Sequence, residues 1–151
     1  MNATTQKVVP LISSGTAGPL GAIHLPRLWL KLSLNAHNML PDGYDLCGQG
    51  FDQMTLSALD LDREKTITYV REKHPTYMQF EEYVLEQNGG NVAPDKITKH
   101  NAAILGYNHA NELGAQMRAA SGNKNANVKD AVTLNTIEDL DELHAQIEST
   151  H

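Results

Sequence analysis

The chain has 151 residues, of which 40% are hydrophobic and 20% are charged, and its formal net charge is −6. This length and composition exclude wholesale disorder and fit one globular domain with a sizeable core. The densest basic patch is only Lys96, Lys99 and His100. Phosphate-rich partners require clustered positive charge, so we expect neither nucleic acid nor a membrane surface as a partner.

Three features bear on the compartment. The single cysteine, Cys47, cannot form an intramolecular disulfide, which fits a reducing environment. No apolar run reaches the roughly 18 residues of a membrane span. Residues 1–12 lack the continuous apolar core of a secretory signal. We therefore expect a cytoplasmic protein.

The chain divides into an arm and a helical domain. Residues 1–21 have no helical periodicity and carry five helix-breaking residues: Pro10, Gly15, Gly18, Pro19 and Gly21. The sequence predicts an extended N-terminal arm over 1–21 and a single helical domain over 22–149.

The first helix is predicted to begin at Pro26, where a missing N–H costs nothing, and to end before the turn at 41–43. It is apolar on more than one side and should be buried. A short helix should follow near Asp52. Asp60 or Asp62 should then cap a helix that runs to about Lys73.

Proline and glycine punctuate the second half. Helices are predicted over 77–87, from Pro94 to a break at 106–109, and from there to about Ala120. Residues 131–134 are the one plausible strand. Asn135 or Thr136 should cap a last helix over 137–147.

The predicted fold is therefore all-α: a compact bundle of five to seven unequal helices with an irregular N-terminal arm and at most one short strand near Val132. The expected core consists of large apolar residues, namely Leu28, Trp29, Leu32, Phe51, Leu56, Leu59, Val70, Phe80, Val84 and Ile104.

Two polar clusters flank the first predicted helix. His24, Arg27 and His37 lie on or beside it, and a glycine-rich stretch after it carries a second set: Asp42, Tyr44, Asp45, Cys47 and Asp52. A histidine titrates near neutral pH and a carboxylate can orient it, while an arginine can clamp a carboxylate with two hydrogen bonds. The pattern predicts a pocket for proton-transfer chemistry. The alternative is that these groups serve only turns and internal pairs.

Catalytic roles follow from the residue types. His24 or His37 would move the proton, and Asp52 or Asp42 would orient the histidine, with Tyr44 as a further polar group. Cys47 is either a nucleophile activated by a histidine or a small apolar filler.

Binding roles fall on residues of three segments. Arg27 would hold an anionic substrate, with Asp52 as an alternative partner within the protein. Trp29 and Tyr77 are either ligand contacts or core. His100 and Asn101 either line the other wall of the pocket or lie on a solvated helix face.

No metal or other cofactor is predicted. The chain has seven histidines, but it lacks the His-Glu-x-x-His, Cys-x-x-Cys and aspartate-rich loop patterns.

The chain resembles a bacterial family of unknown function, number 5069 in the domain-of-unknown-function series. The resemblance covers most of residues 18–147 and is carried by Gly21-x-x-His-Leu-Pro-Arg27, Tyr44, Cys47, Phe51-Asp52 and the segments 75–83, 99–105 and 133–140. The family has no assigned activity, so the resemblance implies a bacterial soluble protein and no catalytic role.

The leading hypothesis is a small cofactor-independent enzyme that performs isomerisation, elimination or hydration on a small anionic organic molecule. One alternative is a non-catalytic ligand-binding or protein-interaction module, with a homodimer as a further expectation. A second alternative is a metal-dependent hydrolase. An enzyme should bring His24, Arg27 and Asp52 together in one concave pocket.

Overall fold

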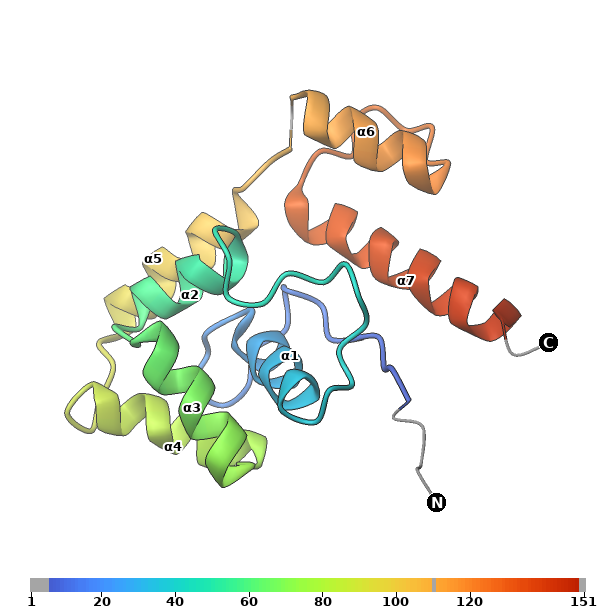
Figure 1. Ribbon diagram of the computed structural model, residues 1–151. Coiled ribbons are helices and arrows are strands. Elements are labelled where there is room, and N and C mark those ends of the chain that lie inside the picture. The colour runs from blue at the N-terminus through green and yellow to red at the C-terminus, as the bar shows by residue number, and fades with distance from the viewer. Residues whose placement is uncertain (1–5, 110, 150–151) are drawn as a thin grey trace, which may run out of the picture.

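The computed structural model describes residues 6–109 and 111–149, and over these residues the chain forms seven helices and no β-strand, apart from two isolated β-bridges (Figure 1). The helices are α1 (Leu25–Ala36), α2 (Phe51–Ala58), α3 (Arg63–Lys73), α4 (Tyr77–Gln87), α5 (Pro94–Leu105), α6 (Glu112–Ser121) and α7 (Ala131–Ser149). The prediction of a compact all-α fold is confirmed. No described helix is both long enough and apolar enough to cross a bilayer.

Local capping explains most of the helix boundaries. The Thr76 side chain accepts the Gln79 N–H, and the Gln79 side chain accepts the Thr76 N–H, so a capping box starts α4 at its predicted position. Of the two predicted caps for α3, Asp62 is the one used, because its carboxylate accepts the N–H of Lys65.

The start of α7 differs from the prediction. Residues 131–134 form its first turn and not a strand, and the cap is Asp130 rather than Asn135 or Thr136. The Asp130 carboxylate accepts the N–H of Thr133 at 2.9 Å. The helix is favoured because it places Ala131 and Leu134 on one buried face, each 1% exposed.

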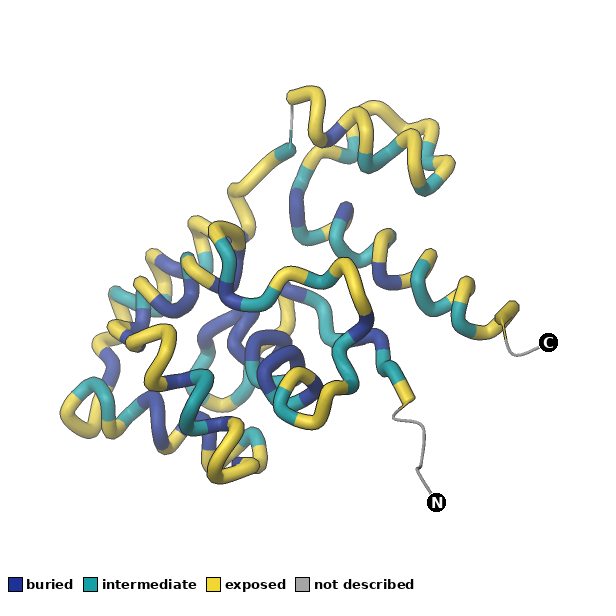
Figure 2. Tube along the Cα trace, in the orientation of Figure 1, coloured by how far each residue is buried: buried dark blue, intermediate teal, exposed yellow. Residues whose placement is uncertain are grey.

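The core is centred on α1. Leu25, Leu28 and Leu32 of this helix are at most 2% exposed and pack against α2, α3 and α4, and Figure 2 shows buried segments gathered around α1. Of the predicted core residues, all but Trp29 are buried. Trp29 is partly buried, and its indole N–H donates to the Pro75 carbonyl at 3.0 Å.

The helices α6 and α7 lie to one side of the other five (Figure 1). They pack on each other, and α7 also contacts α5. A second, smaller apolar cluster joins α7 to the body and consists of Ile23, Phe51, Ile104 and Ala131. This placement sets α7 opposite the polar residues at the start of α1 and α2.

Candidate functional site

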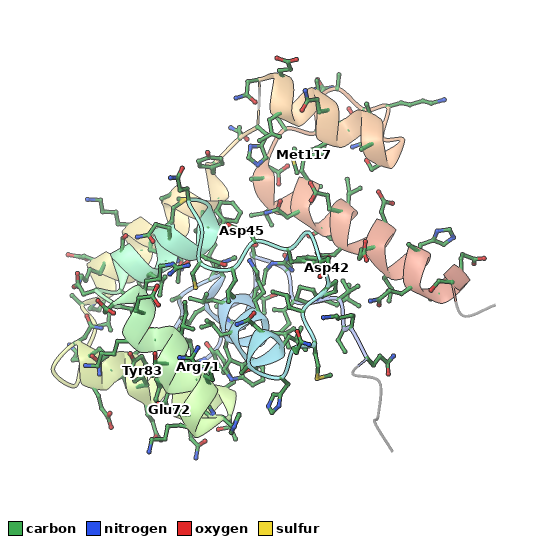
Figure 3. All side chains as sticks on the ribbon, in the orientation of Figure 1. Asp42, Asp45, Arg71, Glu72, Tyr83 and Met117 are labelled. Atoms are coloured by element: carbon green, nitrogen blue, oxygen red, sulfur yellow. The ribbon has the colours of Figure 1, made fainter. Side chains whose placement is uncertain are left out.

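A pocket of about 360 Å³ lies between α1, the α1–α2 loop with the start of α2, and α7. Figure 3 shows Asp42 and Asp45 on the loop that passes between α1 and α7. The lining is strongly polar and consists of His24, Arg27, Lys31, Asp42, Gly43, Tyr44, Asp45, Gly50, Phe51, Asp52, Asn135, Glu138, Asp139 and Glu142. His24, Arg27 and Asp52 therefore share one pocket.

Asp52, in the first turn of α2, is the centre of a buried network. Its Oδ1 accepts from His24 Nε2 at 2.7 Å, and its Oδ2 accepts from Lys31 Nζ at 2.7 Å and from the Cys47 N–H at 2.8 Å. Burial acts to raise the pKa of Asp52, but the His24 hydrogen bond and the Lys31 ammonium outweigh it. The net effect holds this pKa well below its usual range, so the carboxylate is ionised.

His24 has no ring nitrogen left for a ligand. Its Nδ1 lies 3.0 Å from Ser14 Oγ, and its Nε2 faces Asp52. Burial lowers its pKa, although Asp52 acts to raise it, so the ring is neutral at pH 7. Neutral His24 donates from Nε2 to Asp52 and accepts the Ser14 hydroxyl proton at Nδ1.

The backbone of His24 is left-handed, with φ at 68°. Such a conformation is strained for a residue with a side chain, and strained residues gather at functional sites. Here it lets His24 precede α1 directly while its ring reaches Asp52. Cys47, whose N–H also meets Asp52, has φ at 55° as well.

Arg27 is paired within the protein. Its guanidinium donates to both carboxylate oxygens of Asp139 on α7, at 2.6 and 3.1 Å, and to the carbonyls of Pro10 and Ile12 at 2.6 and 3.0 Å. The side chain is buried, with the residue 5% exposed. Its internal partner is thus Asp139 on α7 and not Asp52.

Two other predicted catalytic groups have poor acid–base properties for pH 7. Burial and the hydrogen bond from Tyr44 to Asp139, 2.8 Å long, raise the pKa of the Tyr44 hydroxyl far above its usual value. Burial raises the pKa of the Cys47 thiol to about 12. Cys47 belongs to the apolar core, so its environment is that of a filler and not of an activated nucleophile.

Six of the predicted site residues do not line the pocket, and they are Cys47, Trp29, His37, Tyr77, His100 and Asn101. His37 stacks on His74 beside Trp29, with the two imidazole centroids 4.8 Å apart. The Tyr77 hydroxyl donates to Glu81 at 2.6 Å. His100 and Asn101 fix the turn before α1. His100 Nε2 donates to the Ile23 carbonyl at 3.0 Å, and the Asn101 amide bonds Gly21 and Ile23.

Several residues of the pocket are not among those predicted from the sequence. Lys31 follows Arg27 by four positions and therefore lies on the same helix face, a spacing that identifies it. Glu138, Asp139 and Glu142 likewise share one face of α7. Ser14 sits in an irregular segment and left no signal.

The pocket carries an excess of negative charge. The charges cancel within each of two ion pairs, Arg27–Asp139 and Lys31–Asp52. The remaining carboxylates have no ion-pair partner within the described chain, and they are Asp42, Asp45, Glu138 and Glu142. Burial and the nearby Asp139 raise the pKa of Glu138, as expected for a carboxylate in a negative field.

Within residues 6–109 and 111–149, no three histidine, cysteine, aspartate or glutamate side chains are placed to share a metal ion. No protein-family model matches the chain, and no curated protein matches it. The resemblance to family 5069 stays a prediction.

Proposed function

We propose that the protein is a binding module for a small organic cation, held in the pocket between α1, the α1–α2 loop and α7. The observation that carries this proposal is the set of carboxylates that line the pocket and form no ion pair within the described chain: Asp42, Asp45, Glu138 and Glu142. Their summed field attracts a cation and repels an anion. A volume of about 360 Å³ suits a small organic molecule.

The expected anionic ligand has less support. Arg27, the residue expected to hold the anion, already donates from both terminal nitrogens to Asp139 and also donates to two backbone carbonyls. An anion in the pocket would need to displace Asp139 and then face Glu138 and Glu142. A cation meets no such cost.

Lys31 adds a second recognition element. Lys31 lines the pocket and is 8% exposed. Within the described chain, its ammonium donates only to Asp52. An ammonium has three N–H donors, and a buried one is stabilised by further acceptors. The ligand that fits is therefore an amine that also carries an acceptor oxygen, as amino alcohols and amino acids do.

Calorimetric titration tests this proposal. 2-Aminoethanol should bind and acetate should not. Glu142→Gln should weaken amine binding about fivefold, the loss expected for one partly exposed charge pair. Glu148→Gln is the matched control, because it lies on α7 outside the pocket, and it should bind as the native protein does. Binding of acetate in preference to the amine would overturn the proposal.

A proton-transfer enzyme is the second candidate, favoured by the strained His24 and by the chain of contacts from Ser14 through His24 to Asp52 and Lys31. Catalysis would require His24 to release Ser14 or Asp52. In D₂O, an enzyme of this type would catalyse deuterium incorporation at a carbon of the bound amine, visible by NMR. His24→Asn, which tolerates the left-handed backbone, should abolish the exchange. Absence of exchange in the native protein favours the binding module.

A further inference from the structure

A second, smaller cavity adjoins the acidic pocket. It measures about 160 Å³ and shares Gly50, Phe51 and Asn135 with that pocket. Its other walls are Met54, Tyr107, His109 and Ala131, so it carries none of the carboxylates. An acidic and an aromatic compartment thus meet at one shared wall.

Phe51 forms that wall. Its ring packs edge-on against His24 on the acidic side, with centroids 5.5 Å apart, and against Tyr107 on the other, at 5.8 Å. Tyr107 in turn meets His109 at 5.4 Å. Phe51 is 8% exposed while Tyr107 is 46% exposed, so an aromatic path runs from the buried network to the surface.

Tyr107 is one of the large apolar residues that the described chain leaves exposed. A large aromatic ring exposed beside a cavity offers apolar area to whatever enters the cavity. The volume fits one ring, since an apolar cavity of about 150 Å³ accommodates benzene. The carboxylates of the adjoining acidic pocket select a positively charged group on the molecule that carries such a ring.

We infer that the ligand is an amphipathic amine, with its ammonium group in the acidic pocket and an aromatic substituent in the adjoining cavity between Phe51, Met54 and Tyr107. This inference rests on the proposed function and specifies its ligand class. Specificity then comes from two sources, since charge selects the amine and the aromatic compartment selects its substituent.

The test compares 2-amino-1-phenylethanol with 2-aminoethanol, which differ by the ring alone, and includes phenylacetate as an aromatic anion. The phenyl amine should bind at least tenfold more tightly than 2-aminoethanol, and phenylacetate should not bind. Tyr107→Ala should remove most of the tenfold gain while leaving 2-aminoethanol binding unchanged. Met54→Ala, on α2, provides a second variant if Tyr107→Ala fails to fold.

Leu105→Ala is the matched control. Leu105 is 59% exposed near the end of α5 and lines neither cavity, so its removal should leave both affinities unchanged. Equal affinity for the two amines, together with insensitivity to Tyr107→Ala, would overturn this inference and leave the proposed function intact. Failure of both amines to bind would overturn the proposed function and this inference with it.

Discussion

Arg27 on α1 and Asp139 on α7 form a two-pronged ion pair across 112 residues of sequence, with N–O distances of 2.6 and 3.1 Å. The same guanidinium holds the carbonyls of Pro10 and Ile12. One buried side chain therefore joins the N-terminal arm, the central helix and the last helix, and it fixes the α7 wall of the pocket.

Arg27→Ala should lower the free energy of unfolding by about 3–5 kcal/mol, because it leaves the Asp139 carboxylate buried without its cation. Arg27→Lys should lose less, since lysine keeps the charge but not the planar fork. Urea denaturation measures both. Arg71→Ala, on the exposed side of α3, is the control and should change stability by no more than about 0.5 kcal/mol. Equal stability of the Arg27→Ala and Arg71→Ala proteins would show that the pair is not structural.

Asp52→Asn should destabilise the protein by about 3 kcal/mol or more, because the buried Lys31 ammonium loses its only carboxylate partner in the described chain. Asp45→Asn is the control, because Asp45 lies in the loop that precedes α2 and is exposed. Thermal melts of the two variants measure the difference. A melting temperature of Asp52→Asn equal to that of Asp45→Asn would contradict the role of Asp52 as the centre of the network.

Stability should fall as the pH drops from about 7 to 5. Burial holds the pKa of His24 in the folded state below its ordinary value of 6.5, so below pH 6.5 the unfolded state binds more protons than the folded state. Burial lowers the pKa of His100 too, which adds a contribution of the same sign. Urea midpoints measured across this range should rise with pH. The slope should be shallower in His24→Asn, and an identical slope would contradict the neutral state assigned to His24.

The fold was predictable where local signals decide the structure. Thr76 and Gln79 fix the start of α4 within four residues of sequence, and the sequence places that helix correctly. The start of α7 was not predictable, because the helical state of residues 131–134 depends on the burial of Ala131 against distant residues such as Ile104. A short apolar run does not show from its sequence alone whether its residues repeat with the period of a helix or of a strand.

The candidate site was predictable in its residue types and less so in its pairings. His24 and Asp52 were both identified, and they meet across 28 residues. The sequence suggested Asp52 as the internal partner of Arg27, and only the position of α7 in space selects Asp139. The acidic character of the pocket was missed for the same reason, since three of its carboxylates come from the last helix. Tertiary distances, and not composition, decide which charges cancel.

Cys47 provides the last prediction, on reactivity. Burial raises the pKa of its thiol to about 12 from an ordinary value of 9.0, so its thiolate population at pH 8 should be roughly 1,000-fold lower than in the unfolded chain. The folded protein should therefore react with a thiol reagent such as 5,5′-dithiobis(2-nitrobenzoate) at least 100-fold more slowly than the protein in urea. The absorbance of the released thiolate measures both rates, and Cys47→Ala provides the blank. Rapid, stoichiometric labelling of the folded protein would restore Cys47 as a nucleophile, because only an accessible thiolate attacks at that rate.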